Sequence, residues 1–360
     1  MIKIIKHVED LEPYETGWNR LAELAGNPLL SYEWFKACAL TLHLKDALHI
    51  VIYVEQDRLL AIAPLVKVRR HNVYWLEIMG ASRLCEPTDL LTESPEALGI
   101  LLRSIRSLGY PLILSRIPAD SSLHREYTGA NSHHRSLTKS IPASTSAYID
   151  TSGSWKHFEA RISSRRRYEM RRKLKRCGKL GDVRFDITSP EPDELETAYQ
   201  QAIRVEATSW KFRSGTSLAQ RADLQQFFKT YLQLACAKKQ VRMCFMYIGE
   251  HCVSMHIGIG FNATLWILKL GYDENWSRCS PGILLADATI RHCFEQDFTG
   301  YEFLGSHESW QNNWGIRQHD LTTLIVYPMS IRGLAGLSAH VGYAARKRVA
   351  RNIRSLRQHA

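Results

Sequence analysis

The order of residue patterns along the chain predicts an α+β protein built from two similar halves. Three observations lead to this prediction. Each half opens with apolar residues at helical spacing, continues with short apolar strands joined by tight turns, and closes with one helix followed by a strand. A length of 360 residues also suggests about two domains. The repeated order predicts an internal structural duplication, each copy being a mixed, mostly antiparallel sheet flanked by helices.

In the first half, a helix from Leu11 to Ala25 ends at Gly26-Asn27-Pro28. Ser31 is the expected N-cap of the next helix, which carries Trp34 and Phe35 on one face. The remaining elements are strands at Leu48–Glu55, Leu59–Arg69 and Tyr74–Met79, a helix at Ser94–Leu108 and a strand at Leu112–Ile117. The first two of these strands form a hairpin through Gln56-Asp57-Arg58.

The second half follows a polar connection between Thr128 and Ser146. We expect helices at Trp155–Arg176, Glu191–Lys211, Leu218–Lys238 and Ser280–Phe294, and strands at Val183–Ile187, Val241–Ile248, Cys252–Gly260, Thr264–Tyr272, Tyr301–Leu304 and Thr322–Tyr327. These elements divide the chain into an N-terminal domain at 1–150, a second domain at 151–330 and a basic C-terminal helix at 331–360.

Basic residues concentrate in two segments. The chain has a net charge of +11, of which residues 161–176 carry +8 and residues 341–360 carry +6, so the rest is net −3. Local basicity of this kind predicts anionic partners at these two places, although a solvated helix face has the same composition.

Cysteine spacing and hydropathy exclude several classes of protein. The eight cysteines form no C-x-x-C pair and no Cys/His cluster with zinc spacing, so we expect neither a metal site nor a disulfide framework. Residues 1–10 lack the apolar core of a signal peptide, and no apolar run is long enough to span a bilayer. We therefore expect a cytoplasmic protein.

The most informative motif lies where a strand leads into a helix, at Gly271-Tyr272-Asp273 and Ser280-Pro281-Gly282. Ser280 can cap the helix, Pro281 suits its first position, and Gly282 allows a ligand to approach the backbone. The exposed amides of such a first turn bind anions, so a pyrophosphate would fit there. A well-capped helix without a ligand shows the same residues. The candidate cofactor-binding residues are Arg278, Ser280, Pro281, Gly282 and Leu284.

Two further segments contribute candidate site residues. Glu206 lies one helical turn before Trp210, and Lys211 follows. The segment from Phe303 to Trp314 ends a strand in a polar, aromatic loop of the kind that often lines sites. Packing of the tryptophans and a solvated lysine are the alternative interpretations. The candidate substrate-binding residues are Trp210, Lys211, Glu308 and Trp310.

Three residues are candidates for the catalytic base: Asp273, Glu206 and His256. A carboxylate beside an aromatic ring can have a raised pKa, which suits Glu206 for proton transfer. His256 lies within a predicted strand, where a buried structural histidine is the competing interpretation.

Taken in order, these motifs resemble the acetyltransferase domain of BioF2-like and CelD-type proteins, which are related to the Fem peptidyltransferases. The resemblance runs from the Ser164-Arg165-Arg166-Arg167 segment through Ser209-Trp210-Lys211 and Gly271-Tyr272-Asp273 to Ser280–Leu285 and Gly305–Trp314. Trp310-Gln311 stands where that family usually has Tyr-Lys. The resemblance covers about residues 155–315 and implies a tandem GNAT fold, with one active and one degenerate half.

The resemblance also implies a function. An acyltransferase of this kind would carry an acetyl or acyl group from acetyl-CoA, or another acyl-CoA, to an amine on a small molecule or polysaccharide precursor. Two alternatives remain: a Fem-like transferase that uses aminoacyl-tRNA, and a non-catalytic accessory protein of exopolysaccharide biosynthesis. The two basic segments favour tRNA in the first case and peripheral membrane contact through the C-terminal helix in the second.

Overall fold

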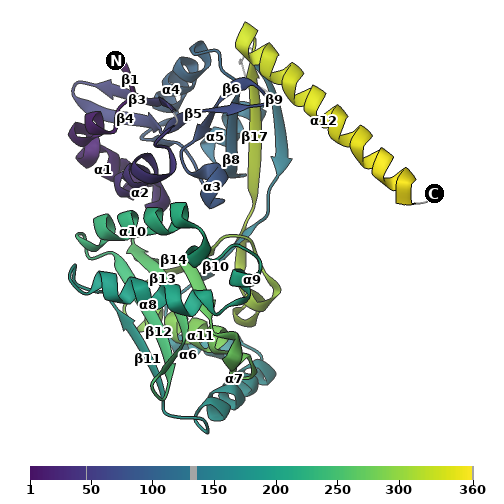
Figure 1. The fold of residues 1–360 in the computed structure, drawn as a ribbon. Coiled ribbons are helices and arrows are strands. Elements are labelled where there is room, and N and C mark those ends of the chain that lie inside the picture. Colours follow the sequence, from purple (N-terminus) through teal and green to yellow (C-terminus); the bar gives the residue numbers. More distant parts are fainter. Residues whose placement is uncertain (46, 130–135, 359–360) are drawn as a thin grey trace. The chain divides into compact units, whose positions relative to one another are not determined.

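The structure, a computed structural model, describes residues 1–45, 47–129 and 136–358. The chain forms two compact units, each assembled from separate segments (Figure 1). The first unit comprises Met1–Ala25, His43–Ala143 and Leu321–Ala360, and the second comprises Gly26–Leu42 and Ser144–Asp320. The domain bounds expected from the sequence, 1–150 and 151–330 with a C-terminal helix at 331–360, stay a prediction.

The first unit contains a four-stranded sheet in the order β1-β3-β4-β7 and a six-stranded sheet in the order β2-β5-β6-β8-β17-β9. Its strands are β1 (Ile2–Ile5), β2 (Ala47–Leu48), β3 (Ile50–Glu55), β4 (Arg58–Ala63), β5 (Leu65–Arg70), β6 (Val73–Ile78), β7 (Leu91–Thr92), β8 (Leu112–Pro118), β9 (Ser136–Pro142) and β17 (Leu321–Pro328). Its helices are η1 (Val8–Tyr14), α1 (Glu15–Ala25), α3 (Ala81–Leu84), α4 (Pro95–Ser107), α5 (Ser122–Thr128) and α12 (Ile331–Gln358).

The second unit is built on a seven-stranded sheet in the order β11-β12-β13-β14-β15-β10-β16. Its strands are β10 (Ser146–Asp150), β11 (Val183–Thr188), β12 (Val241–Ile248), β13 (His251–Phe261), β14 (Thr264–Tyr272), β15 (Gly300–Leu304) and β16 (Arg317–His319). Its helices are η2 (Pro28–Leu30), α2 (Tyr32–Ala37), η3 (Cys38–Leu42), α6 (Trp155–Arg161), α7 (Ser164–Cys177), α8 (Leu195–Ala207), α9 (Trp210–Arg213), η4 (Leu218–Gln220), α10 (Ala222–Cys236), η5 (Glu274–Cys279), α11 (Pro281–Glu295) and η6 (Ser309–Trp314).

The two units repeat one arrangement of strands. In the first unit, β6 pairs antiparallel with β5 on one side and parallel with β8 on the other. In the second unit, β14 pairs in the same way, antiparallel with β13 and parallel with β15. A helix, α4 or α11, stands in the chain between the two parallel strands, as a parallel connection requires. The α+β class with duplicated, mixed sheets is thereby confirmed.

Helices cover both faces of the sheet in the second unit (Figure 1). On one face, Ala286 and Ile290 of α11 pack in a core with Leu265 and Ile267 of β14. On the other face, α8 and α10 lie against the strands, and the ring of Trp34 on α2 packs edge-on against Phe227 of α10 with their centres 4.9 Å apart. This aromatic contact explains why residues 26–42 belong to the second unit.

Several predicted elements were wrong in their extent. The helix expected at Glu191–Lys211 is split into α8 and α9, with Ser209 as the N-cap of α9, so Glu206 and Trp210 lie on different helices. The strand expected at Leu59–Arg69 breaks at Pro64, which has no N–H to donate, and its parts β4 and β5 join different sheets. The helix expected at Trp155–Arg176 breaks into α6 and α7 at Ile162, because the hydroxyl of Ser163 accepts a bond from Arg166 N at 3.4 Å and caps a new helix.

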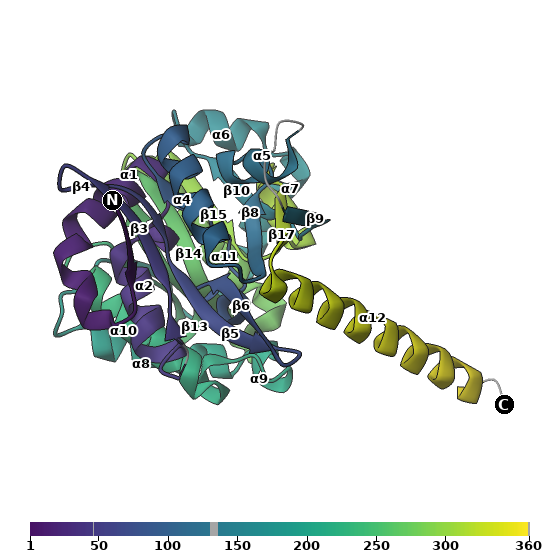
Figure 2. The same ribbon diagram turned by 90° about the horizontal axis from the view of Figure 1, so that it is seen from above.

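The basic C-terminal segment forms the helix α12, whose beginning packs on the first unit. Leu337 lies against Trp75 of β6 and Tyr327 of β17. The ring of Tyr343 stacks on His71, with centres 4.1 Å apart. Figure 2 shows α12 continuing beyond the strands it packs against. Among the helices described, none has the length and apolar character needed to cross a membrane.

Candidate active site

Strands β14 and β15 pair over only part of their length. Their parallel pairing runs from Thr264 opposite Gly300 to Trp266 opposite Glu302 and stops there, although β14 continues to Tyr272. From Ile267 onward this side of β14 has no pairing with β15, and we call this stretch the open edge of β14. Splayed parallel strands leave backbone groups for other partners, so the open edge is the candidate site.

A β-bulge at Leu268 determines which side chains of β14 face α8. Lys269 lies opposite Ile257 and Ile267 opposite Gly258, so Leu268 is the extra residue. Beyond the bulge, Lys269 Nζ lies 4.7 Å from the ring centre of Phe228 on α10. The next residue on that side is Gly271.

Gly271 allows α8 to approach the strand closely. A Cβ atom at this position would lie 3.2 Å from Glu206 Cα and 3.3 Å from Glu206 Cγ. Any larger residue would push α8 outward, because a contact this short forces a neighbour to move. Gly271 thereby places the buried Glu206 directly against the open edge.

The backbone of Leu270 points toward the open edge. Asp273 N donates to Val253 O at 2.9 Å, which marks these two residues as a hydrogen-bonded pair of the β13–β14 ladder. Hydrogen-bonded and non-hydrogen-bonded pairs alternate along an antiparallel ladder, so His256 and Leu270, three positions on, form a non-hydrogen-bonded pair. The N–H and C=O of Leu270 are therefore turned away from β13.

Lys211 on α9 is the partner of the Leu270 carbonyl. Its Nζ donates to Leu270 O at 2.7 Å and lies 3.5 Å from Glu206 Oε1. The other carboxylate oxygen, Glu206 Oε2, accepts bonds from Leu218 N at 2.6 Å and Ser217 Oγ at 3.3 Å. Glu206 is 1% exposed, and a carboxylate buried so completely is stable because it has these donors.

Burial shifts the pKa values of two groups at this site. It lowers the pKa of Lys211, an effect that the Glu206 carboxylate partly offsets. Burial, with the positive charge of Lys211, lowers the pKa of His256 to about 3, so its imidazole is neutral at neutral pH. His256 Nδ1 has no hydrogen-bond partner among the described residues. The site thus combines a carboxylate, an ammonium group and a neutral imidazole.

The predicted cofactor-binding segment lies where β14 leads into α11. Asp273 is half-buried, and its Oδ1 accepts a bond from Asn275 N at 3.0 Å, which caps η5. Ser280 has the N-cap position of α11 but adopts a left-handed conformation, with a φ of 54°, and its side chain makes no capping bond. The expectation that its hydroxyl caps α11 was therefore wrong. The Ser280 carbonyl instead accepts from Ile283 N and Leu284 N.

The other residues of this segment differ in what they offer a ligand. Pro281 occupies the first turn as expected, and Arg278 is exposed. Gly282 has a packing role, since a Cβ there would lie 3.2 Å from Cδ1 of Tyr272. The side chain of Leu284 is buried in the core, so only its backbone could contact a ligand at this turn.

The predicted substrate-binding residues lie on two elements, α9 and the β15–η6 connection. Trp210 begins α9 and is 46% exposed, so its ring is available at the surface. Trp310 is half-buried: its ring packs edge-on against Phe303, and its Nε1 donates to Glu308 Oε2 at 3.1 Å. The Glu308 carboxylate also acts on Lys211, whose pKa it raises slightly. The structure therefore brings Glu308 near the Glu206–Lys211 pair.

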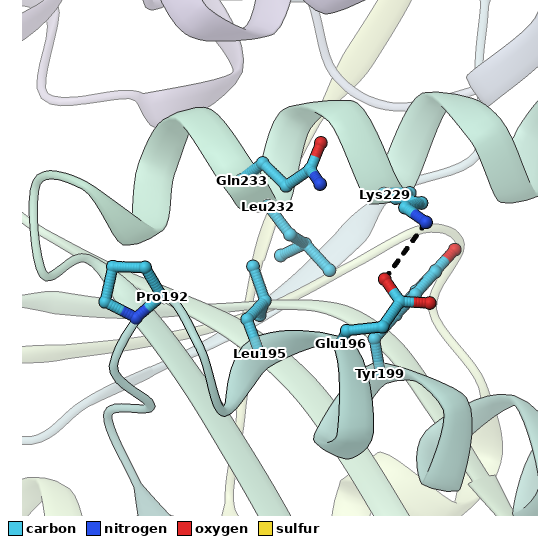
Figure 3. Close-up of a pocket in the computed structure, with 7 residues that line it drawn as sticks. All are labelled: Pro192, Leu195, Glu196, Tyr199, Lys229, Leu232 and Gln233. Atoms are coloured by element: carbon cyan, nitrogen blue, oxygen red, sulfur yellow. Dashed lines mark ion pairs between the residues drawn. The ribbon is translucent and has the colours of Figure 1, made fainter.

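A separate hollow between α8 and α10 does not serve as the site. Figure 3 shows it lined by Leu195 and Tyr199 of α8 and Leu232 of α10, with the Glu196–Lys229 ion pair at one side. The oxygen and nitrogen of that pair are 3.0 Å apart. Its volume is about 40 Å³. Ligand sites usually measure a few hundred Å³, so this hollow has room for only a few water molecules.

Comparison with known proteins agrees with the fold. Residues 164–312 match the family described as "Acetyltransferase (GNAT) domain". No curated protein matches the chain. Among the described residues, no group of histidine, cysteine and acidic side chains could hold a metal ion. The family match identifies a GNAT acetyltransferase domain within residues 164–312, which supports an acyltransferase.

Several solved structures share the fold over almost the whole chain. FemX has a TM-score of 0.62 at 10% identity, covering 91% of this chain and 97% of its own. The C-terminal domain of a putative lysylphosphatidylglycerol synthetase from Agrobacterium fabrum has a TM-score of 0.54 at 10% identity, covering 92% and 96%. L-PGS from Bacillus licheniformis has 0.53 at 12% identity, covering 91% and 96%. At these identities the likeness concerns the fold.

Sequence reasoning identified Glu206 and Lys211 but missed the residues that hold them. Ser217 and Leu218 provide the donors for the carboxylate, and Leu270 provides the acceptor for the ammonium group. The signal for Gly271 was present in Gly271-Tyr272-Asp273, but nothing local connects that glycine with a glutamate on a distant helix.

We expect Glu206→Gln to destabilise the protein by about 2 kcal/mol, because the charged acceptor of several hydrogen bonds is lost while the shape is kept. Denaturant unfolding measures the change. Glu196→Gln on the same helix is the matched control, since its pair with Lys229 is half-exposed and contributes little. Equal effects of the two substitutions would contradict a special role for the buried carboxylate.

His256 should also make the free energy of unfolding depend on pH in acidic solution. Its pKa is lowered from 6.5 to about 3 on folding, so between these pH values the unfolded chain binds a proton that the folded chain does not. Above pH 6.5 this residue does not reduce the free energy of unfolding. As the pH falls from 6.5 toward 3, the free energy of unfolding decreases by about 1.4 kcal/mol per pH unit.

Unfolding measured between these pH values should therefore show a shallower slope for His256→Asn than for the original protein. His251→Asn, an exposed position on the same strand, is the control and should leave the slope unchanged. Parallel slopes for the original protein and His256→Asn would contradict the neutral, buried state of His256.

Proposed function

We propose that the second unit transfers an acetyl or acyl group from an acyl-CoA to an amine on a small molecule or polysaccharide precursor. The observation that carries this proposal is the open edge of β14, with the Leu270 backbone turned toward it and Lys211 beside it. A thioester lying along this edge meets a backbone N–H donor and a nearby cation. Both favour the negative charge that develops on the carbonyl oxygen during acyl transfer.

The buried pair has a positioning role in this proposal. Glu206 holds Lys211 by charge, and the Leu270 carbonyl holds it by a hydrogen bond. An ammonium group fixed in advance stabilises a developing oxyanion without reorganising, which makes its contribution larger than that of a mobile surface lysine. Glu206 and His256 are each 1% exposed, so neither reaches an incoming amine directly.

Asp273 is the base we assign to the proton of the acceptor amine. It is half-buried at the end of β14, and Asn275 N occupies one of its carboxylate oxygens, which leaves the other for an amine. Proton removal accompanies attack of the nitrogen on the thioester carbon, and the coenzyme leaves as the thiol. Trp210 and Trp310 would wall the acceptor side, and Glu308 would attract a cationic amine.

Coenzyme binding is proposed at the turn into α11. Arg278 is exposed beside the first turn, and a helix N-terminus favours phosphate groups. Gly282 and Pro281 contribute to this turn, and Leu284 contributes its backbone.

An aminoacyl-tRNA donor is the second candidate, supported by the exposed arginines of α7 and by the fold shared with FemX. Peripheral membrane contact of α12 is supported by exposed Ile331, Leu334 and Val341 on a basic helix. The expected location is the cytoplasm, where acyl-CoA is available.

We expect acetyl-CoA, or a longer acyl-CoA, at about 100 times its dissociation constant to stabilise the protein by about 2.7 kcal/mol and to raise its melting temperature by several degrees. Thermal unfolding with a panel of acyl-CoAs measures this, and free coenzyme A separates binding of the carrier from binding of the acyl group. Binding of tRNA that weakens steeply with salt, without any effect of acyl-CoA, would favour the second candidate instead.

Asp273→Asn tests the base. Asparagine caps helices as well as aspartate does, so the unfolding midpoint should stay close to that of the original protein. Loss of the base should lower the rate of thiol release from acyl-CoA in the presence of an amine about 100-fold or more. Asp186→Asn, a partly exposed acidic position on β11, is the control. Undiminished turnover in Asp273→Asn would exclude Asp273 as the base.

A further inference from the structure

A second polar cavity lies in the same unit, at the end of β10. Its volume is about 440 Å³, within the range of sites that hold small molecules. Three arginines line it: Arg161 at the end of α6, Arg166 in the first turn of α7, and Arg317 on β16. Phe158 and Trp314 line it as well and supply an apolar wall.

The charges around this cavity do not balance. Asp150 is the acidic residue among those that line it, so three guanidinium groups face one carboxylate and leave a local charge of +2. The Ser152 hydroxyl and amide lower the pKa of Asp150, and Arg317 and Arg161 lower it further, so the carboxylate remains charged. Arg317 Nη1 lies 3.5 Å from Asp150 Oδ2, which accounts for one of the three cations.

Two neighbouring arginines that do not line the cavity are held by structural partners. Arg165 pairs with Glu169, and Arg167 donates to three carbonyl oxygens around the end of α6. Among the described residues, the Arg166 guanidinium has neither a hydrogen bond nor an ion pair. The Cζ atom of Arg161 lies 5.6 Å from the centre of the Phe158 ring, over its face.

This cavity is distant from the turn proposed for coenzyme A. Asp150 lies opposite Gly300, and Gly300 lies opposite Thr264, the first residue of β14. The turn into α11 follows the last residue of β14, Tyr272. The first and last residues of this nine-residue strand are about 26 Å apart at roughly 3.3 Å per residue, so Asp150 and the turn lie toward opposite ends of the strand.

We propose that this cavity binds the phosphate group of a phosphorylated small molecule, of the size of a sugar phosphate or a nucleoside monophosphate. A phosphomonoester carries a charge of about −1.5 to −2 at neutral pH, which matches the unbalanced charge of the cavity. Guanidinium groups bind phosphate oxygens in pairs, and three of them converge here from different elements. The site is independent of acyl transfer.

The test uses the full chain and isothermal titration with inorganic phosphate, glucose 1-phosphate and uridine monophosphate. We expect binding of at least one phosphomonoester, tighter than inorganic phosphate, and a loss of affinity of about tenfold or more in Arg166→Gln and in the double variant Arg161→Gln/Arg317→Gln. Arg171→Gln removes the same charge from an exposed position on α7, outside the cavity, and should bind as the original protein does.

The controls make each outcome decisive. Equal weakening by Arg171→Gln would reduce the effect to general charge and overturn the proposal, as would a lack of binding by all three compounds at millimolar concentration. Binding of RNA alone, with the small phosphates inert, would overturn it in favour of a nucleic-acid surface. Circular dichroism confirms that the variants are folded. Because no turnover is needed, a failure here is distinct from a failure of the acyltransferase proposal.

Discussion

The pairing of β14 with β15 stops after Trp266, and the arrangement of the site depends on this single interruption. Had the ladder continued, Leu270 would have faced a neighbouring strand, and its carbonyl would have been satisfied there. Instead Lys211 reaches the carbonyl from α9. A half-buried ammonium group in turn requires a counter-charge, which Glu206 provides, and the buried carboxylate requires donors, which Ser217 and Leu218 provide. Each polar group in this series thus provides the hydrogen bond or the counter-charge that the preceding group lacks.

The same chain of dependence explains the electrostatics of the site. Because Glu206 is enclosed and its carboxylate oxygens are occupied, in the proposed mechanism it would act through Lys211 and not by direct contact. His256 lies on β13, opposite Leu270. Burial and the positive charge of Lys211 both lower its pKa, so its imidazole is neutral. A charged imidazole at this place would repel the ammonium group that the open edge requires. The neutral state of His256 is therefore part of what keeps Lys211 in position.

The sequence was sufficient for the order of elements and for the candidate residues, because both are carried by local patterns. Periodicity identified the ladder of β12, β13 and β14, and the motif around Ser280 located the start of α11. Contacts between remote segments were beyond local patterns. Nothing near Gly271 indicates that Glu206 approaches it, and nothing in Thr322–Tyr327 indicates that this strand pairs with β8 and β9 of the other half. The break between α6 and α7 depends on a single capping bond to Ser163, and the strongly basic residues on both sides of it gave no signal for a break.

The duplicated architecture raises the question of why one unit would be active, and the answer lies in what surrounds the corresponding strand. In the first unit β6 and β8 also pair briefly, at Leu76–Leu112 and Glu77–Ile113. The carboxylate of Glu77 is buried there, but its partners are Arg70 and Ser82 from neighbouring segments of the same unit, so it stabilises the local fold. The beginning of α12 packs on Trp75 of β6. The second unit differs because α9 contributes a lysine to the open edge, and the proposed acyl transfer depends on that added helix.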